Sequence, residues 1–132
     1  MGYARTPSNL AQMLKNFSRH LNPGGIVILE SWASPNGFRS GIIHLDSVET
    51  HAVRISRMGV TKKHGNMSIV TLHHLIGENG KVRYAVDRHE LGLFAPKTVY
   101  DLMVKAGFKT YIDRRSWFST TFKRPTYVGV KR

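Results

Sequence analysis

Residues 22–30 constrain the fold of this chain more than any other stretch. They read Asn-Pro-Gly-Gly followed by Ile-Val-Ile-Leu-Glu. The proline and the two glycines predict the end of a helix, and the apolar run after them predicts a β-strand. A continuous run of apolar β-formers is typical of a strand that is covered on both faces, as in a parallel sheet. We therefore predict an α/β fold with a strand at 25–30 that is buried on both faces.

An amphipathic helix is predicted before this turn, over residues 7–21. Thr6 is a suitable N-cap, and Pro7 suits the first helical position. Apolar residues recur with the helical period and fall on one side of this helix: Leu10, Met13, Leu14, Phe17 and Leu21.

The middle of the chain follows a different pattern, because apolar and polar residues alternate there as in antiparallel strands. The pair Asn79-Gly80 is a strong signal for a tight hairpin turn. We predict an antiparallel three-stranded insert at about 42–94, with strands at roughly 50–58, 67–76 and 81–91.

The last part of the chain returns to the α/β pattern. Pro96 predicts the start of a helix that ends at Gly107, and strands are expected at 108–112 and 126–130. Residues 114–124, between these strands, form a loop rich in basic, aromatic and hydroxyl side chains.

The chain is strongly basic, with 20 Lys and Arg residues against 8 Asp and Glu residues and a formal net charge of +12. Such a surplus attracts phosphate-bearing partners, whether a nucleotide, a nucleic acid or an anionic lipid. A basic face that is simply solvated would give the same composition. The charge therefore narrows the class of partner without identifying one.

Composition also excludes several classes of site. The chain has no cysteine, so it forms neither disulfides nor thiolate metal sites. His73 and His74 are adjacent, so on a strand they point to opposite faces and cannot bind one metal ion together. No apolar run reaches the roughly 18 residues of a membrane span, and the first residues lack the apolar core of a signal peptide. We expect a cytoplasmic protein without a metal.

The order of these parts resembles the C-terminal half of class I S-adenosylmethionine-dependent methyltransferases. The stretch His-Leu-Asn-Pro-Gly-Gly-Ile-Val-Ile-Leu-Glu at 20–30 is similar to the fifth strand of that family and its approach. Ala-Gly-Phe at 106–108 resembles the turn into the sixth strand, and Tyr-Val-Gly-Val-Lys at 127–131 resembles the seventh. The resemblance implies the C-terminal half of a Rossmann-like methyltransferase sheet, a single partial domain over residues 1–132, with the antiparallel insert.

Within that family, the chain is most similar to the nucleotide-sugar N,N-dimethyltransferases. Glu-Ser-Trp at 30–32, followed by Pro35 and Phe38, resembles their sequence, and so does an insert that ends in His-Glu-Leu-Gly-Leu-Phe at 89–94. In those enzymes the insert covers the substrate. Some of them carry a proposed catalytic histidine where this chain has Tyr3, after Gly2. A phenol orients an amine but is a poor base near neutral pH.

The resemblance implies S-adenosylmethionine as the cofactor, yet the first half of the family fold has no counterpart in residues 1–132. Neither the Gly-rich first loop nor the acidic residue of the second strand is present; Gly24-Gly25 joins a helix to a strand, the reverse of a cofactor loop. We therefore expect this chain alone not to bind the cofactor tightly. We also expect an acceptor-side half that is inactive alone and that associates with a second copy or with a chain supplying the other half, because the strand at 25–30 leaves an apolar edge.

The resemblance and the residue chemistry together give a set of candidate site residues. Tyr3 is the catalytic candidate, and the candidates for binding a small, phosphate-bearing acceptor are Glu30, Trp32, His89, Glu90, Arg114, Arg115 and Arg124. Glu30 ends a buried strand, where ligands of α/β sheets bind. The arginines, beside Trp117 and Phe118, are expected to clamp a pyrophosphate through forked hydrogen bonds. Ordinary structural roles remain the alternative for each residue.

Two other classes of function stay open at this point. A nucleic-acid-binding module would explain the charge and the aromatic residues that alternate with Arg and Lys at 111–127. A non-catalytic remnant that folds by self-association would explain the missing cofactor half.

Overall fold

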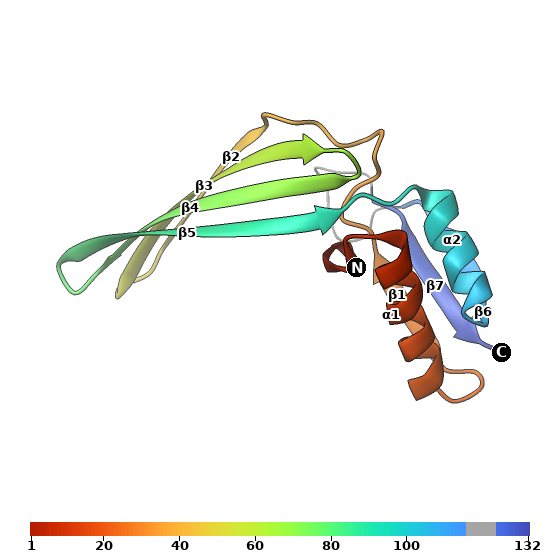
Figure 1. Cartoon of the computed structure of the whole chain (residues 1–132). Helices are drawn as coiled ribbons and strands as arrows, with labels where there is room; N and C mark the ends of the chain where they lie inside the picture. The colour runs from red at the N-terminus through yellow and green to blue at the C-terminus, as the bar shows by residue number, and fades with distance from the viewer. Residues whose placement is uncertain (116–123) are drawn as a thin grey trace. The chain divides into compact units, whose positions relative to one another are not determined.

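The computed structural model describes residues 1–115 and 124–132 of the chain. It divides into two compact units (Figure 1). Unit 1 comprises Met1–Phe38 and Leu91–Arg132, and unit 2 comprises Arg39–Glu90. Each unit has its own sheet.

Unit 1 contains a three-stranded sheet with the order β1-β7-β6. Its strands are β1 (Ile26–Glu30), β6 (Phe108–Asp113) and β7 (Thr126–Lys131). The central strand β7 is antiparallel to both neighbours. The strands at 25–30, 108–112 and 126–130 predicted from the sequence are therefore confirmed. Among the described residues, β1 pairs with β7 alone, as expected for the predicted edge strand.

Two α-helices, α1 (Pro7–His20) and α2 (Pro96–Lys105), belong to the same unit, with a short 3₁₀-helix η1 (Gly2–Ala4) before them. The Thr6 hydroxyl caps α1 by accepting a hydrogen bond from the Asn9 backbone N–H at 3.2 Å. This cap satisfies a backbone donor that the first helical turn leaves without a partner. Both predicted helices are confirmed.

Both helices pack on one face of the sheet and form the core of unit 1. Buried core residues come from the helices, the strands and the segment before α2: Leu10, Leu14, Phe94, Val99, Met103, Phe108 and Tyr127. Gly129 of β7 permits this packing, since a Cβ atom there would lie 2.7 Å from Cε of Met103 and 3.0 Å from Val27. A glycine at this position therefore allows α2 to approach β7.

The opposite face of β1 is exposed, and the prediction that this strand is covered on both faces is wrong for the described residues. Ile26 and Ile28 expose 60% and 61% of their surface. Val27 and Leu29, which point the other way, pack against the core. Because both helices lie on one face of the sheet, a run of four apolar residues is half buried.

Unit 2 is dominated by a four-stranded antiparallel sheet with the order β2-β3-β4-β5. Figure 1 shows its long, twisted strands side by side: β2 (Ile43–Glu49), β3 (Val53–His64), β4 (Met67–Glu78) and β5 (Lys81–Gly92), whose last two residues belong to unit 1. The three predicted strands are present. The prediction of three strands is nevertheless corrected to four, because β2 pairs with β3 from Ile43 to Glu49.

The turn between β4 and β5 has the conformation that its sequence predicts. Asn79 and Gly80 have φ angles of 51° and 70°. Positive φ at both central residues is the signature of a type I′ hairpin turn, whose twist matches that of the flanking strands. Across the described ranges 1–115 and 124–132, no helix is long and apolar enough to cross a membrane.

Replacing Gly80 with valine should destabilise the fold through the backbone alone. A Cβ atom at this position meets no heavy atom within 4 Å, so the effect reports the positive φ angle rather than a clash. We expect Gly80→Val to lower the free energy of unfolding by about 1 kcal/mol or more, measured by urea denaturation.

Gly77→Ala, in the same hairpin, is the matched control. Its added Cβ would lie 3.8 Å from the nearest atom, an ordinary contact. We expect this control to stay within about 0.5 kcal/mol of the unsubstituted chain. Equal unfolding free energies for Gly80→Val and the unsubstituted chain would contradict the turn assignment.

Candidate functional site

The end of β1 and the start of β7 bring three of the predicted site residues together. Glu30 lies opposite Thr126 in the ladder. Beyond it, the Ser31 backbone N–H donates a hydrogen bond to the Pro125 carbonyl at 3.5 Å. One step further, the Arg124 guanidinium lies 4.7 Å from the ring centroid of Trp32. The pairing of two distant segments therefore assembles Glu30, Trp32 and Arg124 at one end of the sheet.

The carboxylate of Glu30 is the chemically notable group of this cluster. Its Oε1 atom is buried and has no hydrogen-bond partner among the described residues. The Thr126 hydroxyl oxygen, opposite it, is in the same situation. Asp113 of β6 lies on the other side of Thr126 in the same row. Directly paired residues share a face, so three oxygen-bearing side chains lie in a row across the sheet.

An unpaired buried oxygen costs free energy that a hydrogen-bond donor on a ligand can recover. The arrangement around Glu30 therefore suits a ligand that brings a donor, such as an amine or a hydroxyl. The Trp32 ring beside it offers an apolar surface, already in contact with the Arg124 cation. This combination can hold a polar, donor-bearing small molecule.

Residues 1–4 lie against the same cluster. Gly2 is buried, and a Cβ atom there would lie 3.2 Å from Leu91 and 3.4 Å from Cβ of Trp32. Burial lowers the pKa of the Met1 amino group, against an opposing effect of Glu30. Tyr3 follows Gly2 in η1 and is 69% exposed. The predicted catalytic tyrosine thus comes from a segment that packs at the site, with its own side chain largely exposed.

His89 and Glu90 belong to unit 2, near the end of β5. Glu90 forms an ion pair with Arg88 at 2.8 Å. Their predicted role beside Glu30 stays a prediction.

The two arginines after β6 have different surroundings. Arg115 forms a forked contact with Asp113, with its Nε atom 3.0 Å from Oδ1 and its NH2 atom 2.7 Å from Oδ2. This hydrogen bonding raises the pKa of the Arg115 guanidinium. Arg114 is exposed and lies close enough to Tyr127 to act on it electrostatically. Trp117 and Phe118, expected near these arginines, lie outside the described residues.

Sequence reasoning missed Asp113, Thr126 and Tyr127. Asp113 directly precedes the two arginines, so a turn that folds its carboxylate back onto Arg115 had a local sequence signal. Thr126 can be identified as a site residue only from its pairing with Glu30 and Asp113 in the sheet. Tyr127 is fully buried, and its hydroxyl has no hydrogen-bond partner among residues 1–115 and 124–132.

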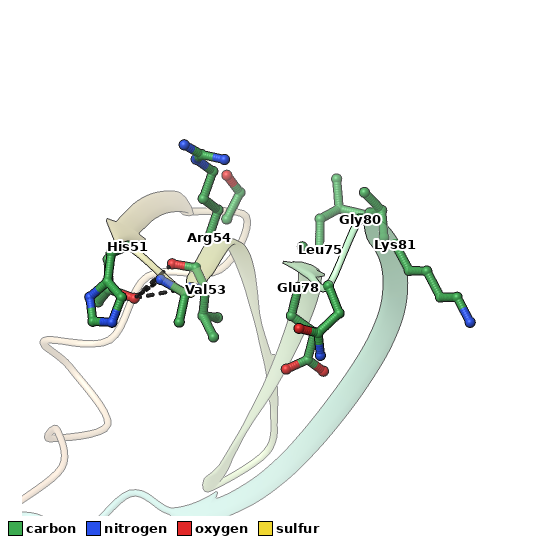
Figure 2. Close-up of a pocket in the computed structure, with 13 residues that line it drawn as sticks. His51, Val53, Arg54, Leu75, Glu78, Gly80 and Lys81 are labelled. Atoms are coloured by element: carbon green, nitrogen blue, oxygen red, sulfur yellow. Dashed lines mark hydrogen bonds between the residues drawn. The ribbon is translucent and has the colours of Figure 1, made fainter.

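A hollow of the structure lies elsewhere, in unit 2. Figure 2 shows it between the turn near His51 and the turn at Gly80, with a volume of about 500 Å³. None of the predicted site residues lines it. We place the candidate site at Glu30, Trp32 and Arg124, because the unpaired carboxylate oxygen there gives a chemical reason for binding. Within the described part of the chain, no group of three His, Asp or Glu residues is placed to hold a metal ion.

Tyr127 should control the stability of the fold at alkaline pH. Burial raises the pKa of its phenol from 10.0 to about 12, against an opposing effect of Arg114. Because the folded state favours the neutral phenol, its contribution to stability is complete below the unfolded pKa of 10.0 and is lost as the pH rises toward 12. We expect Tyr127→Phe to reduce the loss of thermal stability between these pH values.

Near pH 7 the same substitution should change stability little, since the removed hydroxyl has no described hydrogen-bond partner. Tyr100→Phe on the exposed side of α2 is the matched control and should keep the alkaline loss. Melting temperatures of the three proteins from pH 7 to pH 12 test this. Parallel curves for Tyr127→Phe and the unsubstituted chain would refute the assignment.

Comparison with known proteins shows which proteins this chain resembles. No protein-family model matches the chain. The chain is 32% identical over 95 residues to a dTDP-3-amino-3,4,6-trideoxy-alpha-D-glucopyranose N,N-dimethyltransferase from Streptomyces venezuelae, a match that covers 71% of this chain and 40% of the relative. It is 30% identical over 108 residues to a dTDP-4-amino-2,3,4,6-tetradeoxy-D-glucose N,N-dimethyltransferase from Saccharopolyspora spinosa, covering 81% and 43%.

Comparison with solved structures finds proteins of the same kind. The structure of DesVI from Streptomyces venezuelae matches with a TM-score of 0.88 and 28% identity, over 99% of this chain and 54% of that chain. The sugar N-methyltransferase KedS8 from Streptoalloteichus matches with a TM-score of 0.86 and 27% identity, over 99% and 52%. An amino pentose methyltransferase from Micromonospora echinaspora, solved with bound S-adenosylmethionine, shares the fold with a TM-score of 0.83 at 21% identity, over 96% and 52%.

The chain spans about half the length of the relatives it matches. The α/β fold and the resemblance predicted from the sequence are confirmed. The chain is therefore homologous to the nucleotide-sugar N,N-dimethyltransferases, and it has the fold of about half of an S-adenosylmethionine-dependent methyltransferase.

Proposed function

We propose that this chain is the acceptor-binding part of an N-methyltransferase that acts on a nucleotide-linked amino sugar. The observation that carries the proposal is the buried Oε1 atom of Glu30, which lacks a described hydrogen-bond partner. An amino sugar brings the amine donor that this oxygen needs. The relatives named above methylate such sugars, which supports the same substrate class for this chain.

The roles of the individual residues follow from their chemistry. Glu30 accepts a hydrogen bond from the sugar amine and fixes its orientation. Trp32 covers the apolar side of the sugar ring, and Arg124 holds a phosphate oxygen of the nucleotide. Tyr3 orients the amine from the segment that packs against Trp32, and Arg114 and Arg115 add positive charge toward the diphosphate. A role of His89 and Glu90 in binding the acceptor stays a prediction from the sequence.

S-adenosylmethionine supplies an already activated methyl group when it is bound, so the acceptor side needs alignment more than acid–base chemistry. The described residues do not form a cradle for it. The Gly24 backbone N–H is bonded to the Lys131 carbonyl at 2.9 Å, and that of Gly25 to the Asn22 carbonyl at 2.8 Å. These glycines therefore serve the fold, and we assign no step to the cofactor on this chain.

Removing the charge of Glu30 should weaken acceptor binding. We expect Glu30→Gln to raise the dissociation constant of a dTDP-linked amino sugar by roughly 10- to 100-fold, the weight of one hydrogen bond to a charged group. Isothermal titration calorimetry at pH 7 measures this.

Glu49→Gln is the control for that experiment, because Glu49 is exposed and paired with Arg54 in unit 2. The control should bind as the unsubstituted chain does. Equal affinity of Glu30→Gln and Glu49→Gln for the sugar nucleotide would contradict the proposed role of Glu30.

Isothermal titration calorimetry also tests whether this chain binds the cofactor by itself. We expect the chain of residues 1–132 to bind S-adenosylmethionine more weakly than a dissociation constant of roughly ten micromolar, or about −7 kcal/mol. Tighter binding would show that these residues hold the cofactor by themselves. In the proposed arrangement, a second copy or a partner chain completes the enzyme, and a cytoplasmic location stays a prediction.

A nucleic-acid-binding module is the second candidate, favoured by the net charge of +12. It predicts that RNA or DNA binds with an affinity that falls steeply with salt, because phosphate contacts release counterions. A fluorescence anisotropy titration at two salt concentrations distinguishes it from a sugar-nucleotide site.

A further inference from the structure

Two oxygen atoms on the face of the unit 1 sheet opposite the helices are buried without a described hydrogen-bond partner. They belong to Glu30, which ends β1, and Thr126, which begins β7, and the two residues lie directly opposite each other. Leu29 and Tyr127, their neighbours in the two strands, pack against the core. Successive side chains alternate between faces, so Glu30 and Thr126 share the other face.

The hydroxyl of Thr126 needs a partner more than the half-buried carboxylate does. Only 4% of the surface of Thr126 is exposed, so bulk water has little access to it. A buried hydroxyl that makes no hydrogen bond costs free energy. The hydroxyl is also held in place, because it is attached directly to the Cβ atom of a β-branched side chain whose χ1 angle is restricted. A ligand group that meets this hydroxyl must therefore reach one defined position.

The polar side chains next to Thr126 are bonded to other groups. Asp113 lies on the other side of Thr126 in the row. Its Oδ1 atom accepts hydrogen bonds from the backbone N–H and the Nε atom of Arg115, and its Oδ2 atom accepts one from NH2 at 2.7 Å. The buried Ser31 donates its hydroxyl hydrogen to the Pro125 carbonyl at 3.5 Å. A bound molecule is therefore a natural source of the partner that Thr126 lacks.

An amine that Glu30 holds is a poor partner for Thr126 as well. A carboxylate only accepts hydrogen bonds, so Glu30 uses one N–H of the amine. Each methyl transfer replaces one N–H hydrogen of the amine, which leaves as a proton. A secondary amine therefore has a single N–H left. A ring hydroxyl keeps its O–H throughout, and the threonine hydroxyl can donate to it or accept from it.

The strand register limits how far apart the two ligand groups lie. Directly opposite residues have Cβ atoms about 4.5–5.5 Å apart. Glu30 and Thr126 therefore suit neighbouring groups of one small molecule. On a sugar ring, the neighbour of an amine is the substituent of the adjacent carbon.

We propose that Thr126 is a specificity residue of the candidate site. Its hydroxyl forms a hydrogen bond with a ring hydroxyl on the carbon next to the amine, while Glu30 holds the amine itself. The inference rests on the proposed function and narrows the acceptor to amino sugars that carry a hydroxyl beside the amine.

The test compares two sugar nucleotides that share the position of the amine and differ beside it. In dTDP-3-amino-3,6-dideoxyglucose, both carbons next to the amine carry a hydroxyl, and in its 2,4-dideoxy counterpart both carry hydrogen. We expect the 132-residue chain to bind the hydroxylated sugar about 10-fold more tightly, because the deoxy sugar leaves the Thr126 hydroxyl unpaired. Isothermal titration calorimetry at pH 7 measures both dissociation constants.

Three substitutions assign this preference to one hydroxyl. Thr126→Val removes the hydroxyl at nearly constant volume, so it should weaken binding of the hydroxylated sugar by about 10-fold and leave the deoxy sugar within about 3-fold. Thr126→Ser keeps the hydroxyl and should keep the preference. Thr110→Val is the matched control, because Thr110 shares the core side of β6 with Phe108 and bonds the Phe108 carbonyl at 3.4 Å. This control should also keep the preference.

Equal affinity of the unsubstituted chain for the two sugars would overturn the inference. So would a preference that Thr126→Val retains, or one that Thr126→Ser loses. In each of these cases, weaker binding by Glu30→Gln would leave the proposed function standing. A chain that binds neither sugar would overturn the proposed function and this inference together. Thermal melting shows whether each variant folds; should Thr126→Val not fold, the two sugars on the unsubstituted chain and on Thr126→Ser decide.

Discussion

Unit 1 depends on the position of β7 between β1 and β6. This strand supplies the ladder partners of both neighbours, so neither has another partner among the described residues. Its Tyr127 is fully buried in the core, and its Gly129 leaves room for Met103 of α2. The sheet and its helices are therefore held together by six residues near the end of the chain.

The same strand also builds the candidate site. The register that places Glu30 opposite Thr126 continues through Ser31 and Pro125 to the contact of Trp32 with Arg124. A shift of one residue would turn each of these side chains to the other face. The chemistry of the site thus follows from the hydrogen-bonded ladder rather than from any one loop.

Local signals in the sequence predicted most elements of the fold. The Thr6 cap, the helical period of the apolar residues and the Asn79-Gly80 turn each act over a few residues, and each is present in the structure. Strand β2 was missed because the alternation of Ile43 and Leu45 with polar residues ends at Ser47 and Val48, which leaves too short a pattern to identify a strand. The exposed face of β1 was not predicted because the residue types show that the strand is apolar. They do not show which of its two faces other elements cover.

The site was only partly predictable for a related reason. Glu30 could be chosen because it ends a strand, and Trp32 because an indole ring can stack on a base or a sugar. The row that joins Glu30 to Thr126 and Asp113 requires a pairing between segments far apart in the chain, which no local pattern encodes. Arg115, by contrast, is tied to Asp113 only two residues away, and that contact follows from a short turn.

The large separation of β1 and β7 in the sequence has a consequence for how this chain folds. Ser31 and Pro125 are 94 residues apart in the sequence, whereas β2, β3, β4 and β5 follow one another through short turns. Contacts between distant segments form slowly, because the intervening chain must lose its freedom first. The hairpins of unit 2 can therefore form early on the ribosome, while Ile26 to Leu29 wait for their partner strand. During that interval the segment is uncharged, β-forming and without its described partner strand, so we expect it to be a part of the nascent chain that is prone to aggregate.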